Sequence, residues 1–160
     1  MKKDPPTPVH TWLVMLKSMH AISRYALAAL EKSGLGDSDF RVLEVLLHKG
    51  PLPVNVIGPK VNLTPGSISV AVERLVAKGL VSRAESSQDR RVRIVALTPR
   101  GKSVITPIFR VHVATMEEVF AGLSREELRQ LEQHLKCIGR QAESLFDQTI
   151  AKRRSASGRV

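Results

Sequence analysis

Small polar residues gather at the start of one short segment in the middle of the chain. The stretch TPGSISV begins at Thr64, and threonine followed by proline is typical of a helix N-cap with proline at the first helical position. Hydroxyl groups and free N–H groups at a helix start bind phosphate or the polar edges of bases. The residues that lie off the apolar stripe of this helix, and are therefore candidates for contact, are Pro65, Gly66, Ser67, Ser69 and Val70.

A second set of candidate binding residues is Asp89, Arg90 and Arg91. Segments 80–83 and 91–97 flank this set, and their alternation of apolar and polar residues predicts two strands joined by a polar turn. Guanidinium groups at such a tip suit the negative potential of the DNA minor groove. A carboxylate there would repel phosphate, so we expect Asp89 to orient a neighbouring arginine. Taken alone, the motif also fits a solvated turn without a partner.

Helical periodicity surrounds these two segments. A long helix that ends near Gly34 is predicted from apolar residues at three- and four-residue steps: Trp12, Met15, Met19, Ile22, Ala26 and Leu30. A second helix follows cap candidates at 37–39, and a third spans 53–61, where Gly58 and Pro59 predict an early end or a kink. The helix that starts at Pro65 ends at Lys78 and Gly79.

Two further long helices follow the hairpin. Thr98 and Pro99 repeat the cap pattern, and Pro107 predicts a bend in the helix that they start. Ser124 and Glu127 form a capping box before a heptad seam, whose apolar positions are Leu128, Leu131, Leu135, Ile138 and Leu145. So small a chain offers little surface to cover the seam and the first helix, so we expect both to pair with a second copy. An internal antiparallel pair of helices is the alternative.

The predicted fold is mainly α with a small β-hairpin wing, that is, a winged helix-turn-helix with long N- and C-terminal dimerisation helices. The expected organisation is a flexible tail at 1–8, a helical dimerisation domain at 9–36 and 98–150, a DNA-binding domain at 37–97, and a basic flexible tail at 151–160.

Composition narrows the class of partner. The 160 residues carry 25 Lys and Arg against 15 Asp and Glu, a net charge of +10, which favours a polyanion such as nucleic acid. A cationic surface that serves solubility is the alternative. No secretory signal and no stretch of about 18 apolar residues is visible, so we expect a cytoplasmic protein without a membrane partner.

Motifs of catalysis and metal binding are missing from the sequence. There is no glycine-rich phosphate loop, nucleophile elbow or HExxH, and the five histidines form no i, i+4 pair. We therefore expect neither an enzyme nor a cofactor nor a metal site. Cys137, the one cysteine, is expected to be a buried and inert residue of the last helix.

The stretches LTPGSISVAVERLVAKGLVSR and DRRVRIVALTPRG resemble the MarR family of bacterial transcription regulators. The family pattern matches Leu63–Thr64, Arg74–Leu75, 78–81, 89–91 and 97–101. The resemblance implies a homodimer that binds double-stranded DNA, with Thr64 and Arg74 added to the recognition helix. Val70 stands where such helices are often polar, and we expect it to contact a thymine methyl group. The alternative is a charge-driven architectural protein that binds DNA without sequence specificity.

A possible effector site is the last feature of the sequence. Glu44 follows Phe40 by one helical turn, and His112 interrupts an apolar run of the fifth helix. Together with Trp12, this set is similar to the pocket of the hydroquinone- and catechol-responsive branch of the MarR family. The resemblance implies a small aromatic effector, with Glu44 and His112 on its oxygens and the two aromatic side chains on its ring. A buried hydrogen bond between Glu44 and His112 is the alternative.

Overall fold

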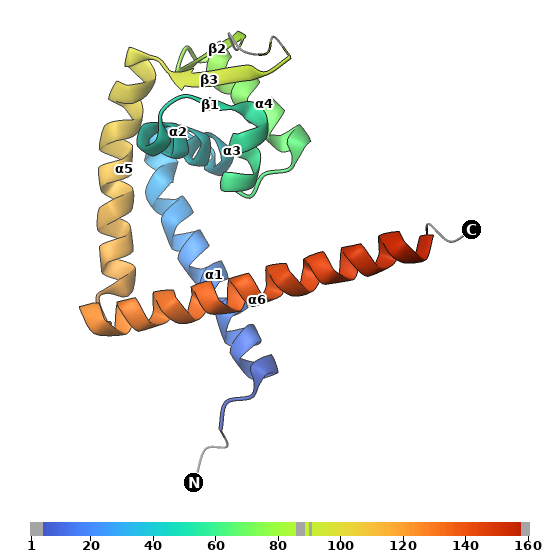
Figure 1. Ribbon diagram of the computed structural model, residues 1–160. Coiled ribbons are helices and arrows are strands. Elements are labelled where there is room, and N and C mark those ends of the chain that lie inside the picture. Colours follow the sequence, from blue (N-terminus) through green and yellow to red (C-terminus); the bar gives the residue numbers. More distant parts are fainter. Residues whose placement is uncertain (1–4, 86–88, 90, 158–160) are drawn as a thin grey trace. The chain divides into compact units, whose positions relative to one another are not determined.

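The chain folds into several long helices and a small winged head, which spans residues 37–97. The computed structural model describes residues 5–85, 89 and 91–157. In chain order the elements are α1 (Pro8–Leu30), the 3-10 turn η1 (Glu31–Ser33), α2 (Asp37–Lys49), β1 (Leu52–Pro53), α3 (Val54–Lys60), α4 (Pro65–Ala77), β2 (Val81–Glu85), β3 (Arg93–Leu97), α5 (Pro99–Phe120) and α6 (Arg125–Ser157) (Figure 1). Contacts divide the chain after Glu117 into two compact units. The predicted winged helix-turn-helix with long terminal helices is confirmed.

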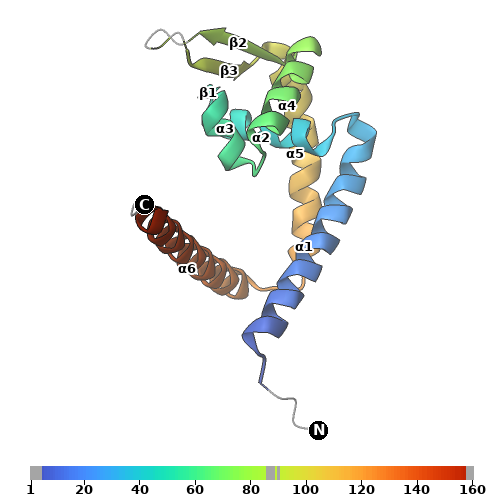
Figure 2. The same ribbon diagram turned by 90° about the vertical axis from the view of Figure 1, so that its right-hand side faces the viewer.

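The sheet has one strand more than the sequence predicted. Strands β2 and β3 form the expected antiparallel hairpin, with Val81 opposite Leu97 and Glu85 opposite Arg93. Strand β1 pairs with the other edge of β3, so the order is β1-β3-β2 (Figure 2). The pattern of alternation cannot reveal β1, because it has two residues, and its Pro53 is tolerated at a sheet edge, where no ladder partner needs its N–H.

The core of the first unit is mostly aliphatic. Helices α2, α3 and α4 cover the sheet, and α4 turns one face inward. The buried apolar residues are Leu30, Phe40, Val42, Leu43, Leu46, Ile57, Val61, Ile68, Ala71, Val72, Leu75, Leu80, Val81, Val95 and Ile105. Four of these come from α4, so its opposite face is free to meet another molecule.

The helix starts predicted at Thr64 and Thr98 are confirmed, whereas α2 follows Gly36 without a side-chain cap, so the cap candidates at 37–39 are wrong. The Thr64 hydroxyl accepts the backbone N–H of Ser67 at 3.2 Å, and the Thr98 hydroxyl accepts that of Gly101 at 2.9 Å. A Cβ at Gly101 would lie 1.8 Å from the carbonyl oxygen of Leu80. Glycine is therefore required at this position, where the first turn of α5 packs against the backbone of Leu80.

The prolines inside helices have different consequences. Helix α3 ends at Lys60, directly after Pro59, which confirms the early end that the sequence predicted. Helix α5 continues through Pro107 to Phe120, and the bend that we expected there stays a prediction.

The second unit consists, in its described residues, of the end of α5, a turn and α6. The predicted capping box is formed: Ser124 N–H donates to Glu127 Oε2 at 2.8 Å, and Glu127 N–H donates to Ser124 Oγ at 3.3 Å. Hydrogen bonds from the side chain and backbone of Ser124 lower the pKa of the Glu127 carboxyl. The flexible tail predicted from Ala151 is wrong for 151–157, which are helical. Alanine, lysine and arginine there are good helix formers, and extending a formed helix is far easier than starting one.

Much apolar surface of α1 and α6 is uncovered within this chain. Trp12 and Met19 of α1 are 56% and 60% exposed, whereas Leu128 of α6 is half-buried. The other predicted seam residues, all substantially exposed, are Leu131, Leu135, Ile138 and Leu145. Cys137, which we expected to be buried, is also exposed, because burial on this helix requires a partner surface. Across the described residues, no helix combines the length and apolar character needed to cross a membrane.

Candidate functional site

The exposed face of α4 carries the small polar residues that the sequence singled out. Ile68, Val72 and Leu75 point into the core, and the helix therefore turns its other side to solvent. The predicted contact residues Thr64, Pro65, Gly66, Ser67, Ser69 and Val70 are all exposed. The structure thus brings these six predicted residues together on one accessible surface.

Intrahelical hydrogen bonds already hold the hydroxyl groups of this surface. Thr64 Oγ1 and Ser67 Oγ lie 2.8 Å apart, and Ser69 Oγ donates to the Pro65 carbonyl at 2.9 Å. Each hydroxyl oxygen keeps lone pairs for a further donor. A Cβ at Gly66 would meet nothing within 4 Å, so the chain itself does not require glycine there. The open space instead allows another molecule to approach the backbone closely.

Arg74, the seventh residue predicted on this helix, is engaged inside the protein. Its Nε and Nη2 atoms donate to Asp39 Oδ1 at 2.9 and 2.6 Å, and Nη2 also donates to Ser38 Oγ at 3.0 Å. The Arg74 side chain is 42% exposed. Its contact with DNA stays a prediction, and the role that the structure gives it is to join α4 to α2.

Asp39 is the acceptor at the centre of this junction, and the sequence analysis missed its role. Its side chain is 1% exposed, and Lys78 Nζ donates to Oδ2 at 3.0 Å. Burial alone would raise the pKa of the Asp39 carboxyl, but hydrogen bonds and charges of Arg74 and Lys78 bring that pKa below its ordinary value. The sequence offered Asp39 merely as a cap candidate, since the two cations come from a distant helix.

The wing supplies cations beside α4. Asp89 Oδ1 accepts the backbone N–H of Arg91 at 2.9 Å, and this contact agrees with the expectation that Asp89 orients a neighbouring arginine. Arg90 lies outside the described residues. Arg93 forms an ion pair with Glu85 across the hairpin. A hollow of about 540 Å³ lies between α3, α4 and the wing, and its lining combines apolar residues with the polar and cationic Asn55, Ser69, Arg83, Arg91 and Arg93.

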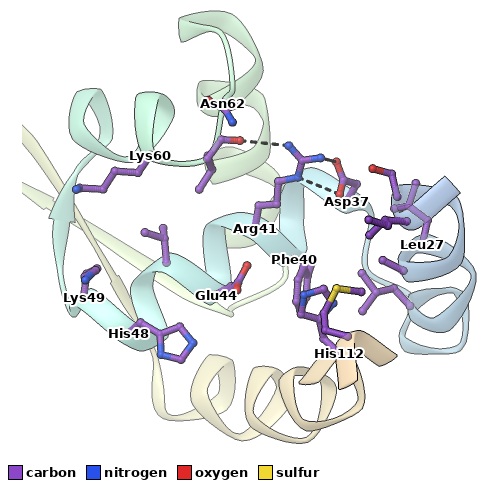
Figure 3. A pocket seen from close by; sticks show the side chains of 17 residues that line it. Leu27, Asp37, Phe40, Arg41, Glu44, His48, Lys49, Lys60, Asn62 and His112 are labelled. Carbon is purple, nitrogen blue, oxygen red and sulfur yellow. Dashed lines mark hydrogen bonds and ion pairs between the residues drawn. The ribbon is translucent and has the colours of Figure 1, made fainter. Parts of the chain in front are cut away.

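A separate cavity of about 460 Å³ lies between α1, α2, the end of α3 and α5 (Figure 3). Of the four residues predicted for an effector site, the structure brings Phe40, Glu44 and His112 to this cavity. Trp12 is not among the lining residues. The cavity is open to solvent, and helix α2 forms much of its wall.

Aromatic contacts and an unpartnered nitrogen mark one end of the cavity. The rings of Phe40 and His112 lie 4.9 Å apart at an angle of 56°, and His48 contacts Phe109 edge to face at 4.6 Å. His112 Nδ1 is buried, and within the described residues it has no hydrogen-bond partner. The alternative, in which this nitrogen and the Glu44 carboxylate share a hydrogen bond, is therefore not formed. A buried imidazole nitrogen without a partner is suited to an oxygen or N–H group of a ligand.

Three cationic residues that the sequence alone did not point to also line the cavity. They are Arg41, Lys49 and Lys60. Arg41 Nε donates to Asp37 Oδ1 at 3.0 Å, and its Nη1 donates to the Val61 carbonyl at 3.3 Å. The i, i+4 spacing of Asp37 and Arg41 is visible in the sequence, but the contact with Val61 requires the fold.

Known proteins resemble the chain along most of its length. A profile of the MarR family matches residues 33–92. The HTH-type transcriptional regulator MhqR of Bacillus subtilis (strain 168) is 34% identical over 136 residues, which are 85% of this chain and 94% of that protein.

Solved structures share the fold. AbsC, a MarR family transcriptional regulator from Streptomyces coelicolor, matches with a TM-score of 0.77 at 22% identity, over 89% of this chain and 99% of AbsC. Bordetella bronchiseptica BpsR, whose DNA binding is regulated by 6-hydroxynicotinic acid, matches with a TM-score of 0.74 at 19% identity, over 84% of this chain and 97% of BpsR.

Replacing Asp39 tests the junction between α2 and α4. Asp39→Asn should lower the free energy of unfolding by about 1–3 kcal/mol near neutral pH, because charge-assisted hydrogen bonds to Arg74 and Lys78 are lost. Folding lowers the pKa of Asp39, so its stabilisation is present above the unfolded pKa of about 4 and disappears as the pH falls through the lower folded value. Urea unfolding at a series of pH values measures the difference between wild type and variant, which should shrink in acid.

The matched control is Asp37→Asn, which alters the exposed pair with Arg41 on the same helix. Its effect should remain within about 0.5 kcal/mol. A difference between wild type and Asp39→Asn that is absent at neutral pH, or that grows in acid, would contradict the role of Asp39.

Proposed function

Since the chain belongs to the MarR family of DNA-binding transcription regulators, we propose that it is a homodimeric repressor which a small aromatic effector releases from a palindromic operator. The family consists of regulators and not of enzymes. One observation carries the proposal: the first unit holds both an exposed polar surface on α4 and a cavity with aromatic residues in its wall. Helix α2 packs against α4 and also lines the cavity.

The recognition surface supports direct contact with base edges. An α-helix fits the major groove, and the exposed hydroxyl groups around Ser67 and Ser69 are donors and acceptors for bases and phosphates. The N-terminus of α4 adds a partial positive charge for phosphate. We propose that Val70, 56% exposed, meets a thymine methyl group, and that Arg90 and Arg91 of the wing reach the adjacent minor groove.

Uncovered apolar surface on α1 and α6 supports a homodimer. Side chains such as Leu135 and Leu145 are 43% and 52% exposed in the single chain, and contiguous apolar surface of this kind marks interaction sites. A two-fold axis makes the same helices face each other and places two recognition helices in successive major grooves. The operator would then be an inverted repeat.

The cavity supports a planar, oxygen-bearing effector. Phe40 offers a ring face for stacking, and Glu44 and His112 offer hydrogen-bonding groups at its edge. The regulation of BpsR by 6-hydroxynicotinic acid, a hydroxylated aromatic acid, is in keeping with this chemistry in a protein of the same fold. The proposal rests on Phe40, Glu44 and His112, and contact of Trp12 with the effector stays a prediction.

Selection of bound sequences from a random pool of DNA duplexes tests the recognition helix and the dimer together. We expect an inverted repeat whose half-sites are centred about 10 bp apart, since each recognition helix enters a successive major groove. A pool without any enriched motif would instead favour a charge-driven architectural protein.

The wing is tested on the selected operator with Arg91→Ala. The change should weaken binding by about 1–3 kcal/mol and lower the slope of log affinity against log salt by about one, since one phosphate or minor-groove contact is lost. Arg110→Ala, which removes an exposed arginine from α5, is the control of equal charge. Equal affinities and slopes for the two variants would remove the wing from DNA recognition.

Effector response is measured by titrating the operator complex with catechol, hydroquinone and salicylate. We expect at least one of them to release wild-type protein at millimolar concentration, and Glu44→Ala and His112→Ala to lose this response while they keep operator affinity. His134→Ala, an exposed histidine of α6, is the matched control. If none of the three compounds releases wild type, the effector part of the proposal fails.

A further inference from the structure

Resting on the proposed function, we propose that Arg41 couples the cavity to the recognition helix, and that effectors act by drawing its guanidinium away from the Val61 carbonyl. Arg41 is half-buried in the cavity wall and bridges two elements. Nε and Nη2 hold Asp37 of the same helix at 3.0 and 2.8 Å, and Nη1 donates to Val61 at 3.3 Å (Figure 3).

The Val61 carbonyl belongs to the turn that sets the start of α4. Asn62 adopts a left-handed conformation with φ of 53°, and Leu63 N–H donates to the Gly58 carbonyl at 2.9 Å. Thr64, the N-cap of α4, follows directly. The Arg41 contact is therefore a tether from the cavity wall to the residues just before the DNA-facing end of the recognition helix.

This tether is the weakest of the contacts that Arg41 makes. Its length of 3.3 Å is beyond the usual range for N–H···O bonds, and its acceptor is a neutral carbonyl. The Arg41 side chain is 39% exposed, so a ligand can reach it. An anionic oxygen is a stronger acceptor for guanidinium than a neutral carbonyl and takes the donor in competition.

The cavity favours a ligand that makes this exchange. Lys49 and Lys60 add positive charge to the wall, against the one carboxylate of Glu44 once Asp37 is paired with Arg41. The aromatic end at Phe40 and His112 holds a ring, and Arg41 lies on the same wall of α2. The effector class is therefore a planar ring with an acidic oxygen, a carboxylate or an ionised phenol.

A second contact between α2 and α4 determines which end of α4 moves when the hydrogen bond to Val61 is lost. Asp39, two residues before Arg41, holds Arg74 and Lys78 in the second half of α4 and beyond it. Helix α2 thus fixes both ends of the recognition region. When the tether at Val61 is released while the Asp39 junction stays, the freed end is the one that carries Thr64 to Val70. DNA binding requires that end of α4 to be in place. The effector therefore lowers the affinity for operator, and the operator lowers the affinity for effector by the same factor.

The variant Arg41→Lys tests the hydrogen bond to Val61 separately from the positive charge of Arg41. Lysine keeps the positive charge in the cavity but lacks the planar fork that holds Asp37 and Val61 together. Without effector, the variant should bind the selected operator about three- to ten-fold more weakly than wild type, as expected for one lost hydrogen bond. Amide hydrogen exchange across 61–68 should accelerate in the variant alone, and in wild type when salicylate is added.

Salicylate then provides the coupling test. Its dissociation constant is measured with and without saturating operator, and the ratio of the two is the coupling factor. For wild type we expect a factor of about five or more, for Arg41→Lys a factor within about two-fold of one, and for Arg110→Lys the wild-type factor.

The outcomes distinguish this inference from the function on which it rests. If salicylate releases wild type and Arg41→Lys alike, the regulator has an effector but Arg41 does not couple it. If Arg41→Lys binds operator and exchanges its amides like wild type, the tether is overturned even before effector is added. If none of the tested ring compounds releases wild type, the effector part of the proposed function fails, and this inference fails with it. Thermal melting shows that each variant is folded.

Discussion

The head of this protein is organised around one buried carboxylate. Asp39 of α2 is out of contact with water and accepts hydrogen bonds from Arg74 and Lys78, so its desolvation is offset by two cations that remain partly hydrated. An arrangement of α2 and α4 that separated Asp39 from these cations would leave a buried charge without compensation. The observed geometry is therefore strongly preferred over such arrangements. The orientation of the recognition helix therefore depends on α2, and so does the wall of the cavity. The recognition helix and the cavity therefore share α2, and this shared helix is the basis of the coupling that we propose.

Helix α4 meets two demands with two faces. Its aliphatic face, with residues such as Ile68 and Leu75, packs in the core and fixes the helix axis. Its hydroxyl face makes weak local hydrogen bonds that bases and phosphates can supplement. Because affinity for DNA comes largely from cations and specificity from base contacts, we propose that the wing contributes mainly affinity and α4 mainly specificity. Arg74 is an exception on α4, because its charge is paired with Asp39 and stabilises the fold.

Uncovered apolar surface is the other constraint on the chain. The stripe of α6 and the first half of α1 cost free energy in water, and a second copy is the economical way to bury them. The cavity beside α1 is formed within the first unit by helices α1, α2 and α5 with the end of α3. A ligand in the cavity would contact the same α1 that carries the exposed stripe, so the proposed effector site and the proposed dimer contact share this helix.

Local patterns in the sequence determined the helices, their caps and the hairpin. Thr64 with Pro65, Thr98 with Pro99, and Ser124 with Glu127 announce helix starts through contacts within a few residues, and the structure has all three. The polar face of α4 and the grouping of Phe40, Glu44 and His112 also follow, the latter by resemblance to a family. What the tertiary structure alone decided are contacts between distant segments: β1 on β3, Arg74 and Lys78 on Asp39, and Arg41 on Val61. Periodicity reports which face of an element is apolar, but it cannot report which distant partner a buried charge or a backbone carbonyl will meet.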